Sequence, residues 1–358
     1  MAEEGPRVNA EGLKAFLTEV LRKVGVPEDD GRITADVLVA SDLRGIPSHG
    51  VARFPRYVNG IEDGIMMPVA KTNIVHETPL TAVMDGGDGL GQVVGFRAMN
   101  LAIEKAKAVG LGFVSVRGSN HYGIAGYYSM MALQHDLIGI SMTNAAPLVV
   151  PTHAKHMMLG TSPISVAVPA GKERPFVFDA ATAIVPRGKL EVYSRKQQPI
   201  PLGWAVDESG RASGETDRIL KNMTDRTGGG LTPLGGEGEV MGGHKGYGFA
   251  LLVDIFSAIL SGGLWSHLTY PKKAGKPLPA KVAHFFGAMR IDYFVPVHEF
   301  KAGLDDMIRT LKNAAKAEGT ERIWIHGEKE FQASDENLTI GVPLEEKVVK
   351  ELKATGEK

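Results

Sequence analysis

The fold class depends first on six residues, Gly87-Asp88-Gly89-Leu90-Gly91-Gln92. They begin like the glycine-rich fingerprint of a dinucleotide-binding domain, but Gln92 stands where the last glycine of that fingerprint belongs. The stretch also lacks a clean strand–turn–helix unit with an acidic residue about twenty positions further on. A Rossmann domain is therefore not expected, and the fold has to be inferred from the patterns on either side.

The chain before this stretch has the pattern of helices. Apolar residues recur at helical spacing over residues 13–24, and Pro27 ends the pattern. A second helix is expected over 33–43, where Gly45 stops it, and a third over 54–61. The connection between the second and third helices can point a side chain outward.

The chain changes from about residue 72 to short strands separated by Gly and Pro. Strands are expected at 83–85, 112–116, 139–143, 164–168, 176–178 and 285–291, and helices at 92–109, 124–135 and 246–260. Helix returns around 304–311 and again after Val342-Pro343, since Pro suits the first helical position. Helices around a mixed α/β middle are typical of one domain inserted between two halves of another.

Length and composition limit the class of protein. A chain of 358 residues predicts two domains or one large interrupted domain. A net charge of -1 provides no basic field for nucleic acid, and the absence of cysteine excludes disulfides, thiolate metal sites and a Cys nucleophile. The N-terminus lacks signal-peptide features, and the apolar segment 247–264 is too short and polar to span a bilayer. We expect a cytoplasmic protein that binds neither nucleic acid nor membrane.

The connection between the second and third helices carries the first candidate chemistry, Asp42-Leu43-Arg44-Gly45-Ile46-Pro47-Ser48-His49-Gly50-Val51-Ala52-Arg53. His49 can exchange a proton near neutral pH. Arg53 offers a planar fork that matches a carboxylate. Together they indicate proton transfer on a small carboxylate-bearing molecule, although a loop His beside an Arg is also common on ordinary surfaces.

Two further segments place polar residues at the ends of strands. Ser119-Asn120-His121-Tyr122-Gly123 follows the strand that ends at 116, a position where α/β sites collect. The alternative is that Ser119 or Asn120 only caps the next helix. Asp179 ends an apolar strand and can approach a ligand or orient a histidine, with an ordinary turn aspartate as the alternative.

A fourth segment, Gly242-Gly243-His244-Lys245-Gly246-Tyr247-Gly248, opens a helix. Its backbone amides and Lys245 can approach an anion. It fails the P-loop pattern because no Gly directly precedes Lys245 and Gly246 stands where Ser or Thr belongs, so a flexible loop is the alternative. His153 and His156 can touch one metal ion, but no third ligand is evident, and no metal site is expected.

Taken in order, these segments resemble the type-2 malate/L-lactate dehydrogenases, a family of NAD(P)-dependent oxidoreductases. The family also contains ureidoglycolate and sulfolactate dehydrogenases, diketogulonate reductases and cyclic imino-acid reductases. The matching pieces span about residues 10–330, while 220–239 fits the pattern loosely. They are 42–53 with Tyr57, 119–126, 160–169, 178–182, 201–205 and 242–263.

The resemblance implies an α/β (α+β) fold. A non-Rossmann cofactor domain with a largely antiparallel or mixed sheet, over 73–295, is inserted into a helical domain built from both chain ends, 1–72 and 296–358. It also implies a homodimer, with the sites near the interface.

The resemblance implies these roles. His49 is the catalytic acid/base and Asp179 its partner, while His121 matches a histidine that some members use as proton acceptor, so the choice between His49 and His121 stays open. Arg53 clamps the substrate carboxylate, with Ser48 and Thr161 beside it. The residues that would line the cofactor are Asp179, Ala180, Ala181, Thr182, His244, Lys245, His326, Gly327 and Glu328, although plain packing can also explain the last three.

The implied activity is hydride transfer between NAD or NADP and the C2 carbon of a 2-hydroxy or 2-oxo acid. The nearest resemblance is to the malate/oxaloacetate branch. L-Lactate, sulfolactate, ureidoglycolate and cyclic imino acids remain alternatives. A non-catalytic protein that binds a small acid or a nucleotide is the alternative from another class, and the intact set His49, Arg53, Asp179 and Lys245 argues against it.

Overall fold

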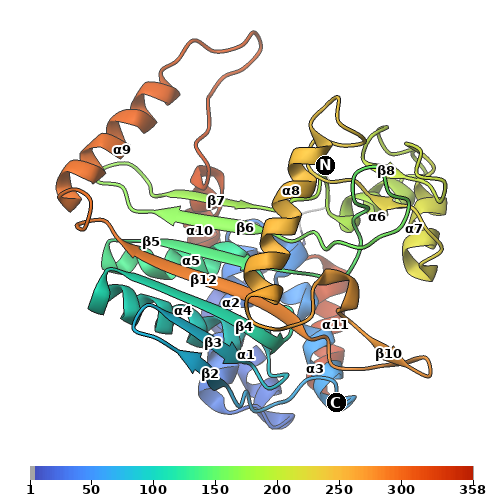
Figure 1. Cartoon of the computed structure of the whole chain (residues 1–358). Coiled ribbons are helices and arrows are strands. Elements are labelled where there is room, and N and C mark those ends of the chain that lie inside the picture. The colour runs from blue at the N-terminus through green and yellow to red at the C-terminus, as the bar shows by residue number, and fades with distance from the viewer. Residues whose placement is uncertain (1–4, 358) are drawn as a thin grey trace.

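A seven-stranded sheet in the order β2-β3-β4-β12-β5-β6-β7 crosses the centre of the computed structural model, which describes residues 5–357 (Figure 1). The sheet strands are β2 (Asn73–Glu77), β3 (Thr81–Asp85), β4 (Leu111–Ser119), β5 (Leu137–Thr143), β6 (Ile164–Val168), β7 (Phe176–Ala180) and β12 (Val282–Arg290). The short strands are β1 (Arg7–Val8), β8 (Ala205–Val206), β9 (Gly230–Leu231), β10 (Lys272–Lys273), β11 (Lys276–Pro277) and β13 (Val342–Pro343). The helices are α1 (Ala10–Lys23), α2 (Glu28–Leu43), α3 (Phe54–Glu62), α4 (Gly91–Val109), α5 (Ala125–Met131), α6 (Arg187–Arg195), α7 (Thr216–Asp225), α8 (Gly243–Asp254), α9 (Val297–Lys312), α10 (Glu328–Ile340) and α11 (Glu346–Glu357).

The sheet is mixed and largely antiparallel, as expected. Neighbouring strands run antiparallel except β3 and β4, which are parallel because α4 carries the chain back between them. The late strand β12 lies in the middle, between β4 and β5. Helix α4 packs on one face of it, and the π-helical turn Ile255–Ile259 after α8 packs against it as well, so 282–288 is continuously buried.

The glycine-rich stretch before α4 does lie in a strand–turn–helix unit, contrary to expectation, because it joins β3 to α4 and β4 then runs parallel to β3. Its glycines serve packing. Gly87 takes a left-handed conformation (φ +58°) in the turn after β3. A Cβ on Gly91 would lie 2.2 Å from the carbonyl oxygen of Asn120. Only glycine therefore lets the start of α4 approach the segment after β4, which explains a glycine-rich sequence outside a Rossmann domain.

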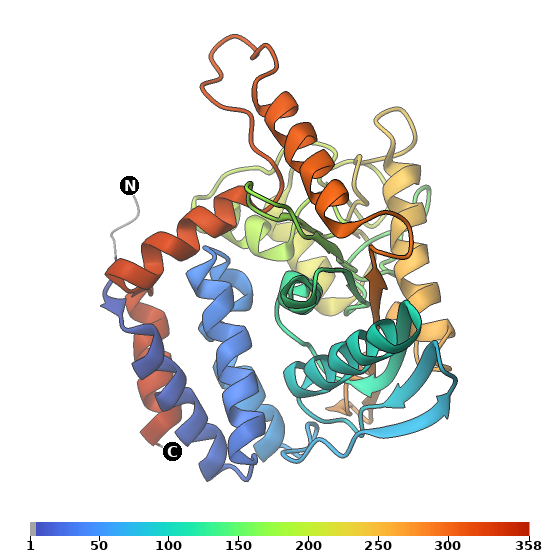
Figure 2. The same ribbon diagram turned by 90° about the vertical axis from the view of Figure 1, so that its left-hand side faces the viewer.

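Helices from both ends of the chain lie side by side, as expected (Figure 2). Helix α1 packs on α2, α11 packs on α3, and β1 pairs with β13. Leu17 and Leu21 of α1 and Leu38 of α2 are fully buried, and each stabilises the fold by about 1.5–3 kcal/mol. The same apolar core continues into α4 and the sheet. The domain boundaries near 72 and 295 stay a prediction.

Two local expectations were wrong. Pro343 lies in β13 opposite Arg7 instead of opening a helix, because Val342 is buried against β1, and α11 begins only at Glu346. The helix expected over 246–260 starts at Gly243, and its last part, Ile255–Ile259, is a π-helical turn.

Candidate active site

A cavity of about 220 Å³ collects the candidate catalytic residues and most of the candidate substrate-binding residues. Ser48 and His49 reach it from the connection between α2 and α3, and His121 from the segment after β4. Thr161 and Asp179 enter from the ends of neighbouring strands in the sheet. Five side chains that the sequence spreads over some 130 positions therefore line one cavity.

The connection that carries His49 is held against the end of α2. Pro47–His49 forms a 3₁₀ turn. The buried Asp42 carboxylate accepts a hydrogen bond of 2.7 Å from the Val51 N–H. A Cβ on Gly50 would lie 2.2 Å from both carboxylate oxygens of Asp42, so the backbone can approach only because this residue is glycine.

Asp42 predicts a pH-dependent stability. Burial raises its pKa to about 7, although the Val51 N–H opposes the shift. The folded protein then binds this proton more tightly than the unfolded chain, so ionisation of Asp42 lowers the free energy of unfolding as pH rises from about 4 to 7. Asp42→Asn keeps an acceptor for Val51 and removes the buried charge. We expect its melting temperature, relative to wild type, to be higher at pH 8 than at pH 4.5 in circular dichroism.

Asp305 provides a control, because its carboxyl has a lowered pKa and should stabilise the fold when it is ionised. Burial raises its pKa, but the N–H groups of Lys172, Glu173 and Gly171 outweigh burial and hold the pKa below the usual range. Asp305→Asn should therefore cost about the same stability at pH 4.5 and at pH 8, and its deficit relative to wild type should shrink only below about pH 4, where the wild-type carboxyl takes up a proton. The same offset from wild type at both pH values in Asp42→Asn would contradict the assignment to Asp42.

His49 is neutral at physiological pH. Burial, and then the positive charges of Arg53 and Arg56, lower the pKa of its imidazole to about 4. The Ser48 hydroxyl lies 2.8 Å from Nδ1, while the described residues offer Nε2 no hydrogen-bond partner. Nε2 is thus the ring nitrogen left for a ligand.

His121 lies against His49. The two rings stack with centroids 5.5 Å apart, and the Tyr57 hydroxyl lies 2.7 Å from His121 Nδ1. Burial, and then the charge of Arg56, hold the pKa of His121 well below its usual value. The site therefore presents two neutral imidazoles, and both remain candidates for the acid/base.

Two groups at the site were missed in the sequence. Tyr57 fits the apolar spacing of the third helix and is fully buried, so the pattern gave no sign that its hydroxyl meets His121. Arg56 lies near both histidines and donates a hydrogen bond of 2.8 Å to the Tyr270 hydroxyl, and Tyr270 lines the cavity. Its position one helical turn beyond Arg53 was the available signal.

The Asp179 side chain is exposed where it faces the cavity, although protein atoms crowd around its carboxyl. Burial raises the pKa of its carboxyl to about 6, while the Gly126 N–H and the charge of Arg44 oppose the shift. The Gly126 N–H donates to Oδ2 at 2.7 Å. Among the described residues no hydrogen bond joins Asp179 to His49 or His121, so its partnership with a histidine stays a prediction.

Arg53 stands at the rim. Its Nε donates a hydrogen bond of 2.7 Å to the Ser48 carbonyl, and its side chain is exposed and does not line the cavity. This bond ties the arginine to the backbone next to His49. A carboxylate clamp by Arg53 stays a prediction.

Some of the candidate cofactor residues line at least one of two cavities, and the others line neither. Ala181 lines the first cavity, whereas His326 and Gly327 line a second cavity of about 290 Å³ that shares Asp179 and Ile46 with it. Because they share these two residues, the two cavities adjoin.

The remaining candidates lie elsewhere. Thr182 is buried and donates a hydrogen bond of 3.0 Å to the Ser162 carbonyl, and Ala180 ends β7 and lines neither cavity. Glu328 is buried in ion pairs with Lys312 and Arg322. His244 and Lys245 are exposed at the start of α8 and line neither cavity.

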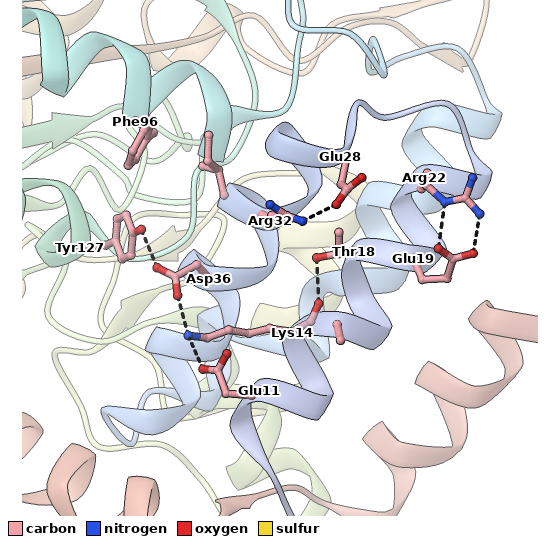
Figure 3. A pocket seen from close by; sticks show the side chains of 12 residues that line it. Glu11, Lys14, Thr18, Glu19, Arg22, Glu28, Arg32, Asp36, Phe96 and Tyr127 are labelled. Carbon is pink, nitrogen blue, oxygen red and sulfur yellow. Dashed lines mark hydrogen bonds and ion pairs between the residues drawn. The ribbon is translucent and has the colours of Figure 1, made fainter.

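A larger cavity lies elsewhere and is lined by paired charges. It measures about 720 Å³ and opens beside α1 and α2 (Figure 3). Its charged side chains pair with one another: Lys14 lies 2.7 Å from Asp36, and Arg22 lies 2.8 Å from Glu19. Chemistry, rather than size, therefore selects the His49 cavity.

Neither a metal cluster nor a membrane span is present in the part of the chain that the structure describes. Within residues 5–357, no three His, Asp or Glu side chains lie close enough together to hold a metal ion. Over the same residues, no helix combines the length and apolar character needed to cross a membrane.

Known proteins resemble the chain over nearly its full length. A profile described as malate/L-lactate dehydrogenase matches residues 8–353. Malate dehydrogenase of Pyrococcus abyssi is 49% identical over 347 residues, covering 97% of this chain and 93% of that protein. L-sulfolactate dehydrogenase of Methanocaldococcus jannaschii is 42% identical over 320 residues, covering 89% and 88%. The solved structure of malate dehydrogenase from Pyrococcus horikoshii OT3 matches with a TM-score of 0.89 at 46% identity, covering 99% of this chain and 96% of that one.

Proposed function

The chain belongs to the malate/L-lactate dehydrogenase family, and from this premise we propose that it interconverts malate and oxaloacetate with NAD or NADP as cofactor. The observation that carries the proposal is the pair of stacked, neutral imidazoles of His49 and His121 beside Arg53 and Arg56. The similarity to malate dehydrogenase at 49% identity, against 42% for an L-sulfolactate dehydrogenase, supports malate as the substrate.

The cavities fit a small acid next to a larger cofactor. The first cavity, about 220 Å³, has room for a four-carbon acid and holds the titratable groups. The second, about 290 Å³, adjoins it at Asp179 and leaves room for part of a nucleotide. A reduced nicotinamide nucleotide that extends from the first cavity into the second would supply the hydride for C2.

The protein residues then position the acid and supply the proton. Arg53 binds the substrate carboxylate through its guanidinium, and Arg56 adds positive charge behind it. Protonated His49 donates its Nε2 proton to the oxygen on C2 as that oxygen gains charge, and the imidazole becomes neutral. In the oxidation of malate the neutral imidazole takes the hydroxyl proton. The pKa of about 4 suits this second direction in the free enzyme.

Reduction requires that His49 take up a proton when the 2-oxo acid binds. The arginines that hold its pKa down are the groups that the substrate carboxylates would neutralise, so binding should raise the pKa. We expect net proton uptake at pH 6 when the unreactive analogue oxamate binds to the enzyme with NADH. Calorimetry in two buffers of different ionisation enthalpy measures this uptake. Binding without uptake would contradict the role of Arg53 and Arg56 in setting the pKa of His49.

A kinetic panel tests the proposed activity. NADH and NADPH are each offered with oxaloacetate, pyruvate, sulfopyruvate and a cyclic imine, and the absorbance of the reduced nicotinamide is followed. Oxaloacetate should be consumed fastest with at least one cofactor. If another acid is consumed faster, the substrate assignment is wrong. If none consumes either cofactor, the non-catalytic binding protein becomes the better account.

We also propose that the protein is a homodimer that associates through the outer face of α8 and of the π-helical turn that continues it to Leu260. The inner side of this helix is buried, and its outer side exposes large apolar residues to between 37% and 59%. A helix that is apolar all round is normally buried in the assembled protein. The exposed residues are Phe249, Leu251, Leu252, Ile255, Phe256, Ile259 and Leu260.

Charge on this face should separate the subunits. Leu252→Glu with Ile259→Glu is expected to shift the protein from dimer to monomer in sedimentation experiments, because each carboxylate would be buried without a partner. Leu338→Glu is the matched control, since Leu338 is 62% exposed on another helix, α10. A wild-type protein that sediments as a monomer, or a double variant that stays dimeric, would contradict the proposed interface.

A further inference from the structure

Arg44 is a buried cation without a partner. It is only 8% exposed, it lines the second cavity, and its guanidinium carbon lies 4.7 Å from the centre of the Phe331 ring. No described residue makes a hydrogen bond or an ion pair with its side chain. Burying a charge without a partner costs several kcal/mol, so proteins normally pair it. A counter-charge that arrives with a ligand would satisfy it.

The other charges around the second cavity do not supply the missing partner. Asp179 and Glu330 influence Arg44 only from beyond ion-pair distance, and Asp179 already accepts the Gly126 N–H. Lys329 lines the same cavity and pairs with neither carboxylate; its ammonium group lies over the Trp324 ring. The charged groups are therefore spaced around an open volume of about 290 Å³ rather than closed on one another.

We propose that Arg44 binds a phosphate group of the nicotinamide nucleotide in the second cavity. This inference rests on the proposed function, which puts the reacting end of the cofactor beside His49. Because the cavities share Asp179 and Ile46, a ligand that starts at the first continues into the second. The planar guanidinium fork matches two phosphate oxygens, and only a full negative charge neutralises a buried cation.

The position of Arg44 in the chain supports this role. It follows the last residue of α2, five residues before His49, and Asp42 in the same turn ties the His49 connection down. One short segment would therefore hold the cofactor phosphate at one end and the proton-transfer group at the other. Displacement of Arg44 would move the cofactor without touching the imidazoles.

Three ligands separate phosphate binding from other roles. NADH and reduced nicotinamide mononucleotide carry phosphate, whereas reduced nicotinamide riboside does not. Arg44→Met keeps an unbranched side chain over Phe331 and removes the charge. It should bind both phosphate-containing ligands about 10- to 100-fold more weakly, since a hydrogen-bonded charge pair is lost, and bind the riboside as wild type does. Titration of dihydronicotinamide fluorescence measures all three affinities.

Arg174→Met is the matched control. The Arg174 guanidinium also lies over Phe331, at 5.6 Å from the ring centre, but this residue is exposed, pairs with Asp335 and lines neither cavity. It should leave all three affinities unchanged. Arg44→Lys keeps the charge without the fork and should lose part of the affinity for NADH. If Arg44→Met does not fold, the affinities of Arg44→Lys test the proposal instead. They should fall for the phosphate-containing ligands and stay unchanged for the riboside.

Each result has one meaning. If the wild-type enzyme binds none of the three ligands and does not bind NADPH either, the proposed function itself fails. If it binds them and Arg44→Met binds NADH equally well, Arg44 does not hold the cofactor. If Arg44→Met loses the riboside together with NADH, the guanidinium contacts the nicotinamide end and the phosphate assignment is wrong.

Discussion

Replacing His49 with alanine is expected to lower the turnover of oxaloacetate by about 10²- to 10⁴-fold, the usual contribution of a general acid. Cofactor affinity should change little, because the cofactor phosphate is proposed to bind in the second cavity, which His49 does not line. The measurement is kcat from the loss of reduced-nicotinamide absorbance, with NADH affinity from fluorescence. Melting temperature should stay close to wild type, since His49 is half-buried and its ring bonds only Ser48.

His121→Ala and Ser48→Ala are the comparison variants. Ser48→Ala removes the hydrogen bond at His49 Nδ1 and should cost less than removing the ring itself. If His49→Ala turns over normally while His121→Ala does not, the acid/base is His121. That outcome would make the Tyr57 hydroxyl, 2.7 Å from His121 Nδ1, the group that sets its tautomer.

Gly50→Ala is expected to lower both activity and stability. The new Cβ would lie 2.2 Å from both oxygens of the Asp42 carboxylate, so either the carboxyl or the backbone beside His49 must move. Overpacking of this kind costs about 1–3 kcal/mol of unfolding free energy. Urea denaturation checks the stability, and kcat should fall because the connection that carries His49 and Arg53 shifts.

A double variant tests whether contact between the new Cβ and the Asp42 carboxylate causes the loss of stability. Asp42→Ala removes the carboxyl that Gly50→Ala would strike, so the stability costs of the two substitutions should not add. Gly188→Ala is the control, because a Cβ there meets open space in α6. Additive costs, or an equal loss in Gly188→Ala, would show that Asp42 does not support the connection.

Local patterns predicted the parts of the fold that depend on neighbours in sequence. The helical spacing before Pro27, the stop at Gly45 and the short strands from residue 81 onward depend on periodicity and on turn residues, and the structure has them. Gln92 in place of the last fingerprint glycine argued against a Rossmann domain, and the largely antiparallel sheet agrees with that. The glycines there instead permit close packing contacts. The long-range pairing of β12 with β4 and β5 had no local signal.

The site residues could be predicted from the sequence where the residue type itself indicates a chemical role. His49, His121 and Asp179 stand out as titratable groups at the ends of elements, and the structure places all three at one cavity. Tyr57 and Arg44 were missed as functional groups because each sits in an apolar or helix-ending pattern. Their significance comes from what surrounds them in space, a histidine for Tyr57 and an unfilled cavity for Arg44.

The wrong expectation at Pro343 also comes from a contact between residues far apart in the sequence. Proline suits the first position of a helix, but it also suits the edge of a short strand, where its missing N–H is not needed. Arg7, more than 300 residues away in the chain, decides between the two by pairing with it. A second apolar core, built from residues between Val149 and Ala250 and including α6 and α7, likewise forms through contacts that periodicity did not reveal.

In the proposed mechanism His49 and Arg53 bind the same small acid, and a crystal structure with NADH and oxamate bound would show whether they do. We expect His49 Nε2 within hydrogen-bond distance of the oxygen on the oxamate carbon that stands for C2, and the Arg53 guanidinium on the carboxylate. If both side chains point away from the acid, with neither within hydrogen-bond distance of it, the mechanism is wrong.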